Sequence, residues 1–304
     1  MIEAPYYDIG IRLGLIAREE VLILDTGTAT TFRDAILPFM KSRGLNKIHK
    51  AINLHAHQDH VGSNVELKEY YGTEIMCHRM AGSYLRNAEE GLSFFAKYAK
   101  YFSAETFEEV KKGYYAERGR PSLPDRLLSD GDIVLSDGVE LEMIAAPGHS
   151  DSLLCVLDRT ERVLYASDAV QGQGVMSRQF PSLPLYENVE EYLSSMRRLA
   201  RVDFKQLVPG HPYAPYGQPV LNRTEGLDLL DKSVKAVEDL EKTILLCLDE
   251  SKGRLNLQTL TAEVQKRTTG GAVTPQALCT VNAHIRRLIF KGLATVEKIA
   301  VDGA

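Results

Sequence analysis

The sequence contains no run of 18 or more apolar residues, so no transmembrane helix is expected. It begins Met-Ile-Glu-Ala-Pro-Tyr-Tyr-Asp, with neither a basic start nor an apolar stretch behind it, which argues against a signal peptide. It has few cysteines, which are scattered and form no Cys-x-x-Cys pair: Cys77, Cys155, Cys247 and Cys279. Scattered cysteines suit reduced thiols, so we expect a cytoplasmic protein without membrane partners.

The composition excludes a disordered, collagenous or coiled-coil chain, because 44% of the 304 residues are hydrophobic and 25% are charged. The formal net charge of −5 is unevenly spread. Residues 251–304 contain eight Lys or Arg and three Asp or Glu, a net charge of +5, so residues 1–250 carry −10. An acidic body argues against broad contact with nucleic acid, although the basic C-terminal part leaves nucleic acid open as a partner.

Up to about residue 210 the chain alternates strand-like and helix-like segments. We predict strands over residues 9–16, 21–25, 50–54, 73–77, 139–145, 152–157, 162–166 and 206–209. We predict helices over residues 31–41, 64–71 and 188–200.

Residues 80–125 break this rhythm, because they are helix-like and rich in aromatic side chains. Nine of the 23 Tyr and Phe residues lie between Tyr84 and Tyr115. One interpretation is a helical pair packed on its own core. The other is a lid insertion whose apolar side faces a ligand. The sequence leaves both open.

A second change comes after residue 220. Three helices and a β-like tail are predicted there, over residues 225–250, 255–264, 274–293 and 294–303. Helices followed by a β-like tail resemble a winged-helix module. We therefore predict a catalytic domain over residues 1–220, with the lid insertion at 80–125, and a helical, winged-helix-like extension over residues 221–304.

The strongest motif is a cluster of three histidines and one aspartate directly after the predicted strand 50–54: His55, His57, Asp59 and His60. Imidazole and carboxylate groups are ligands for zinc, manganese or iron. His55 and His57 alternate along an extended segment and can point the same way. Asp59 and His60 lie past the strand end and can turn toward a second ion.

Three weaker motifs follow other apolar segments: Pro147-Gly-His149, Ser167-Asp168 and Pro209-Gly-His211. Each alone has little specificity, since a Gly-His pair in a turn is more often structural. Together with the first cluster they supply enough ligands for a dinuclear site.

In these motifs, together with Asp25-Thr-Gly27, the chain resembles the metallo-β-lactamase superfamily of hydrolases. The resemblance covers about residues 1–220. It implies an α/β (α+β) fold, a four-layer αββα sandwich with the metals at one edge. It is specific for the fold and the metals but says little about the substrate.

The resemblance also implies a ligand set for two divalent ions, and we favour zinc over the iron or manganese that the same ligands suit. The first ion would be held by His55, His57 and His149. The second would be held by Asp59, His60 and His211. Asp168 would bridge both, and Asp25 would brace the ligand loop. We also assign Asp59 and Asp168 to catalysis, because carboxylates set the charge and position of the metals.

A metal-bridging water made acidic by two ions could attack an ester, thioester, lactone, amide or phosphodiester. A lactamase that destroys antibiotics is disfavoured, because no export signal is visible and those branches usually carry Cys or Ser where this chain has Asp168. We favour hydrolysis of an activated acyl bond, a thioester, lactone or ester of a small molecule. The aromatic segment 84–115 and the acidic body support this.

The alternative is a metal-dependent ribonuclease that cleaves single-stranded RNA. The predicted C-terminal helix carries Arg286, Arg287 and Lys291, which could meet phosphates. The same three side chains could instead form a solvated face. Winged-helix modules also serve packing and dimerisation, so a homo-oligomer stays open.

Overall fold

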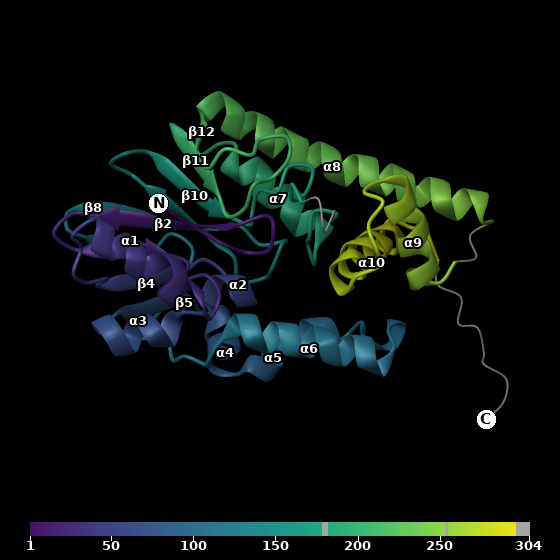
Figure 1. Ribbon diagram of the computed structural model, residues 1–304. Helices are drawn as coiled ribbons and strands as arrows, with labels where there is room; N and C mark the ends of the chain where they lie inside the picture. Colours follow the sequence, from purple (N-terminus) through teal and green to yellow (C-terminus); the bar gives the residue numbers. More distant parts are fainter. Residues whose placement is uncertain (178–181, 253–254, 296–304) are drawn as a thin grey trace.

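The computed structural model describes residues 1–177, 182–252 and 255–295. In this part of the chain two six-stranded sheets lie face to face between helical layers, which confirms the predicted αββα sandwich (Figure 1). The first sheet has the order β1-β2-β3-β4-β5-β6: Ile2–Ala4, Ile11–Ala17, Val21–Leu24, Lys50–Asn53, Glu74–His78 and Arg126–Leu128. The second has the order β12-β11-β10-β9-β8-β7: Leu221–Asn222, Gln206–Pro209, Val163–Ser167, Leu154–Asp158, Val139–Ala145 and Ile133–Ser136.

The central strands are buried on both faces, and their sequences are accordingly apolar throughout. In β3, Leu22 and Leu24 pack between the two sheets, while Val21 and Ile23 pack against the outer helices. Successive side chains of a strand point to opposite faces, so one four-residue strand contributes to two cores. The strands therefore hold the two sheets and one helical layer together.

Helices cover the outer face of each sheet. The first sheet is covered by η1 (Phe32–Ile36), α1 (Leu37–Ser42) and α3 (Asn64–Tyr71), and the short α2 (Gln58–Val61) follows β4. The second sheet is covered by α7 (Val189–Leu199) and the long α8 (Arg223–Glu250). The bounds of α3 agree with the prediction, because Gly72 adopts φ 69° and ends the helix in the left-handed conformation that glycine permits.

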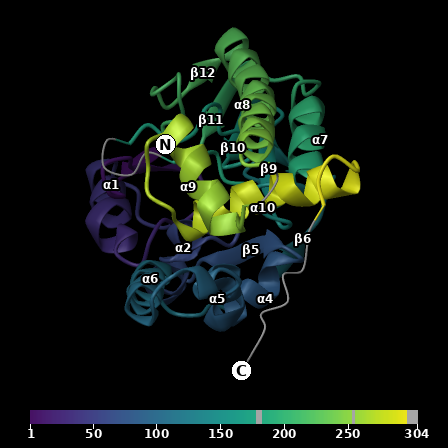
Figure 2. The ribbon, with the colours of Figure 1, turned by 90° about the vertical axis from the view of Figure 1, so that its right-hand side faces the viewer.

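The predicted insertion is helical: α4 (Ala81–Arg86), α5 (Ala88–Ala96), η2 (Ala99–Tyr101) and α6 (Ala104–Arg118). Its helices share a small core built from Leu92, Phe95 and Tyr114. On its other side Tyr98 packs against Leu278 of the C-terminal region. The insertion therefore packs against the C-terminal region, and Figure 2 shows both on the side of the molecule that faces the viewer.

The C-terminal region contains α8, α9 (Leu257–Arg267) and α10 (Pro275–Phe290). Its buried side chains, among them Ile244 and Val281, belong to the same hydrophobic core as the outer face of the second sheet. The described residues after Asn222 include no strand, and the predicted β-like tail lies outside the described residues from 296 onward. The winged-helix module and the domain boundary at 220 stay predictions. No helix in the described ranges is both long and apolar enough to span a membrane.

Candidate metal centre

The site forms where the carboxyl ends of several strands meet. Strands β3 and β4 pair in parallel, as do β10 and β11, so the residues that follow them leave the sheets at one edge. Asp25 follows β3, His55 follows β4, and Asp168 and His211 follow β10 and β11. The structure thereby brings together all the residues predicted as ligands: His55, His57, Asp59, His60, His149, Asp168 and His211.

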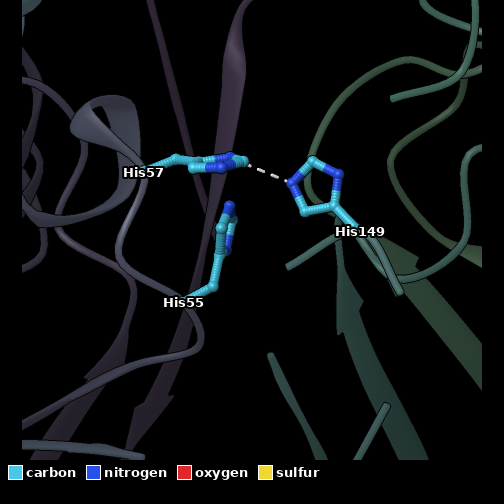
Figure 3. Close-up of side chains that lie close together, drawn as sticks. All are labelled: His55, His57 and His149. Carbon is cyan, nitrogen blue, oxygen red and sulfur yellow. Dashed lines mark hydrogen bonds between the residues drawn. The ribbon is translucent and has the colours of Figure 1, made fainter. Parts of the chain in front are cut away.

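The predicted ligands form two groups. The nitrogen and oxygen atoms of each group lie within 4.8 Å of one another, which is close enough to share one ion. The first group contains His55, His57 and His149, and His149 Nε2 lies 3.0 Å from His57 Nδ1 (Figure 3). The second group contains Asp59, His60 and His211. These are the two sets that the resemblance implied.

Asp168 lies between the two groups. Its Oδ2 atom is near the Nε2 atoms of four histidines, at 3.4 Å from His60, 3.6 Å from His211, 3.7 Å from His149 and 3.9 Å from His55. Two of these imidazoles belong to each group. A single carboxylate oxygen in this position suits a bridge.

The histidines are oriented by their second ring nitrogen. In three of them Nδ1 lies at hydrogen-bond distance from an acceptor: His60 from Asp25 Oδ2 at 2.8 Å, His149 from the Leu185 carbonyl at 2.7 Å and His211 from the Gly10 carbonyl at 2.7 Å. Donation from Nδ1 leaves Nε2 unprotonated and directed at the cluster. Asp25 also accepts from the backbone N–H of Leu54 and from Ser167 Oγ, so it ties the ligand loop to both sheets.

The cluster fits metal ions because several of its buried polar atoms have no hydrogen-bond partner. Within the described ranges, both ring nitrogens of His55, Nε2 of His60 and Oδ1 of Asp168 are buried and make no hydrogen bond. Buried polar atoms in proteins are normally satisfied. Several orphaned atoms of ligand type within one cluster are explained by cations, to which these donor types bind.

The protonation states of the first ligand group and of the carboxylates suit metal binding. Burial, and then the neighbouring imidazoles, lowers the pKa of His55 well below its usual value, and burial lowers the pKa of His57 to about 3. Although burial opposes ionisation, the imidazoles of His211 and His60 hold the pKa of Asp168 well below its usual range. Neutral imidazoles and ionised carboxylates are the forms that coordinate metals. Although burial opposes it, Asp59 and Asp168 raise the pKa of His60 and His211, so these two imidazoles must release protons when a metal binds.

Sequence reasoning missed several residues around the cluster. Gln171 donates to the carbonyl of Leu185 and lies 3.0 Å from His149 Nδ1. Because Gln171 is three residues after Asp168, its spacing could have indicated a place in the same turn. Tyr6 donates to Glu117, and its ring centroid lies 5.8 Å from that of His211. No sequence signal links Tyr6 to Glu117 or to His211, because these residues lie far apart in the chain.

A pocket opens beside the first ligand group. His57, Ser150 and Asp151 line one side, and aromatic side chains of the insertion line the other: Tyr84, Phe94, Phe95 and Tyr114. The ring centroids of Phe94 and His57 are 6.2 Å apart. The insertion therefore has its own core and also lines a pocket at the cluster.

The basic residues that the ribonuclease interpretation requires are mostly paired within the chain. Arg287 Nε lies 2.6 Å from Glu190, and a second nitrogen of the same side chain bonds to Glu241. The Lys291 ammonium lies 3.7 Å from Glu241. Arg286 donates to the carbonyl of Glu187. Two of the three cations are thus already neutralised.

We expect the Asp25→Asn substitution to weaken metal binding and activity roughly 10- to 100-fold, the usual effect of losing a group that orients a ligand. Asparagine tolerates the left-handed backbone of Asp25, at φ 61°, but it removes the negative charge beside His60. Zinc titration monitored in competition with a chelator measures the change. Asp158→Asn is a matched control, because Asp158 is also buried and accepts two backbone N–H bonds but lies outside the cluster. Equal zinc affinities in the two variants would contradict the bracing role.

Comparison with known proteins agrees with this geometry. Residues 13–211 match the metallo-beta-lactamase superfamily. An acyl-coenzyme A thioesterase of Gallus gallus is 35% identical over 95 residues, which cover 30% of this chain and only 32% of that relative. A hydroxyacylglutathione hydrolase of Haemophilus influenzae is 27% identical over 168 residues, 54% of this chain and 69% of the relative. The solved structure of a metallo-beta-lactamase family protein from Thermus thermophilus shares the fold, with a TM-score of 0.74 at 20% identity over 96% of this chain and 93% of that one.

Proposed function

This chain belongs to the metallo-beta-lactamase superfamily, and on that basis we propose that it is a metal-dependent hydrolase that cleaves the thioester bond of a small acyl substrate. Two relatives support an acyl substrate, because one is named an acyl-coenzyme A thioesterase and the other a hydroxyacylglutathione hydrolase. Both names describe cleavage of an acyl group from a sulfur carrier. Lactones and esters are the next candidates.

We also propose that the seven clustered residues hold two divalent ions, zinc in the first instance. His55, His57 and His149 would hold one, Asp59, His60 and His211 the other, and Asp168 both. Such ions supply an activated water and stabilise negative charge that develops on the substrate oxygen. Asp59 and Asp168 provide the negative charge that offsets the cations, and Asp25 keeps His60 in the tautomer that faces them.

The observation that supports an acyl substrate most directly is the pocket beside His57. Its wall from α5 and α6 is aromatic, and its other wall carries His57 and Ser150 of the cluster side. An apolar wall next to polar ligands can bind an acyl chain while it holds the reacting carbonyl at the cluster. The same aromatic rings would exclude water from the bound acyl chain of the substrate.

The test is a hydrolysis screen of the purified chain with acyl thioesters, esters, lactones and short single-stranded RNA, with elemental analysis of the same sample. We expect turnover of a thioester and a metal content close to two per chain. Metal-dependent cleavage of RNA without turnover of any acyl compound would overturn the proposal in favour of the ribonuclease. The internal pairing of Arg287 and Lys291 makes that result less expected.

We expect Phe94→Ala to raise the KM for an acyl thioester several-fold while leaving the metal content unchanged. Phe94 is only half-buried and faces the pocket near His57, so the substitution removes substrate contacts rather than ligands. Phe107→Ala is the control, because Phe107 packs on the internal core of the insertion and does not line the pocket. The control should lower the melting temperature with little change in KM. Equal loss of stability and unchanged KM in both variants would favour a purely structural insertion.

A cytoplasmic location is also part of the proposal. It is supported by the cysteines, all of which are buried free thiols.

A further inference from the structure

We propose that a basic groove between the insertion and α10 binds the phosphate-bearing end of the substrate's thiol carrier, a carrier of the nucleotide type. The inference rests on the proposed thioester hydrolysis and adds the chemical class of the carrier. The groove lies between η2, the end of α5 and the C-terminal helices, which Figure 2 shows on the same side of the molecule.

The groove adjoins the pocket at the cluster. Phe94, Lys97 and Glu187 line both cavities. The groove then extends past Tyr98 and Tyr101 to α9 and α10, and its cavity volume is about 340 Å³. A long substrate whose reacting bond lies at His57 could therefore extend its other end into the groove.

The charges change along this path. The pocket beside the cluster is lined by three carboxylates, those of Glu90, Asp151 and Glu187, and by the single ammonium of Lys97. The groove beyond it keeps Glu187 but adds Lys100 and Arg286, so three cations line it against one carboxylate. The far end of the path therefore selects for negative charge.

The cations of the groove keep most of their charge for a ligand. In the described ranges neither Lys100 nor Arg286 forms an ion pair, and the one ion pair of Lys97, to Glu187, is long at 3.8 Å. Neighbouring cations of α10 differ, because Arg287 and Lys291 are paired with Glu241. Carboxylates of α7 and α8 thus neutralise the cations at the end of α10, while Arg286 of α10 faces the groove.

Phosphate groups match this arrangement best. Arg binds phosphate oxygens in a bidentate manner and Lys acts as a point charge. The half-buried ring of Tyr101 borders the cations, and the Lys100 ammonium lies 5.2 Å from the centroid of this ring. Aromatic rings beside phosphate-binding cations can stack against a nucleobase, which a nucleotide-type carrier provides.

The experiment compares one acyl group on two carriers, coenzyme A and N-acetylcysteamine, which lacks phosphates. The enzyme should show a lower KM for the coenzyme A thioester, and the double substitution K100A/R286A should raise that KM about 10-fold or more. The KM for the N-acetylcysteamine thioester should change little. Lys112→Ala is the matched control, because Lys112 lies on the exposed side of α6 outside the groove. Free coenzyme A should bind the unchanged chain, and added salt should weaken this binding.

The outcomes separate this inference from the proposed function. Turnover of both thioesters with no preference for coenzyme A, or an equal rise of both KM values in the double variant, would reject the groove and leave thioester hydrolysis intact. If neither thioester is hydrolysed, the proposed function fails. The groove is then tested by direct binding of coenzyme A alone, which should be lost in the double variant. Binding of single-stranded RNA but not of coenzyme A would also reject the inference.

Discussion

Asp168→Asn is expected to remove both metal ions and to lower kcat/KM by more than about 100-fold. This exceeds the usual effect of losing a group that only orients a ligand, such as Asp25. The Oδ2 atom of Asp168 lies within 3.9 Å of imidazole nitrogens from both ligand groups. Asparagine has nearly the same shape but carries no charge, so two cations would lose the anion that they share. Because one side chain belongs to both sites, both should empty together.

Elemental analysis after exhaustive dialysis measures this effect, alongside kcat/KM. The unchanged chain should hold close to two ions and the variant less than one. Asp203→Asn is the control for loss of one aspartate charge, because Asp203 forms an exposed ion pair with Arg162 outside the cluster. A variant that keeps two ions would show that Asp168 is not the bridge. An unchanged chain that stays below one ion after metal supplementation would refute the dinuclear assignment itself.

Gly210→Ala is expected to reduce activity about 100-fold although it replaces no ligand, because small misplacements of reacting groups have effects of this size. A Cβ atom at Gly210 would lie 2.3 Å from Oδ1 of Asp168, far inside van der Waals contact. The backbone of Gly210 cannot easily retreat, since its N–H donates to the Ser167 carbonyl and its own carbonyl accepts from the N–H of Arg12. The Asp168 carboxylate must therefore shift from its present position among the histidines.

Gly217→Ala is the matched control for this substitution. The nearest atom to its new Cβ is the Met176 sulfur at 3.6 Å, which is an ordinary contact. The two variants should differ more in metal affinity, measured by metal titration, than in melting temperature, measured by thermal unfolding. Full metal affinity in Gly210→Ala would mean that the Asp168 carboxylate is not held in place by its close approach to the glycine.

Much of the site could be predicted from the sequence because its residues occupy strand ends. An apolar segment followed by a histidine or aspartate can be recognised locally, and parallel strands such as β3 and β4 bring their carboxyl ends to the same edge. The density of His55, His57, Asp59 and His60 then pointed to metal. Helix α3 could be predicted with its bounds, since Gly72 ends it through its own backbone conformation.

The edge strands could not be predicted in this way. Strands β1 and β12 have three and two residues, too few for a periodic pattern. They exist because a neighbouring strand offers them a partner, β2 for β1 and β11 for β12. Pairing of that kind depends on the folded arrangement and leaves little trace in the local sequence.

The sequence by itself therefore determined most of the strands and helices and the motifs that carry the family resemblance, because these depend on local pattern and on residue type. The resemblance in turn implied the fold and the residues predicted as ligands. Only the tertiary structure decided how those side chains are oriented and what surrounds them. The Gly10 carbonyl orients His211, from 201 residues away in the chain. Lys97 and Arg286 come to line one groove, while Arg287, one residue along, is paired with Glu241. Such contacts are set by how helices and loops dock, and docking joins residues that have no relation along the chain.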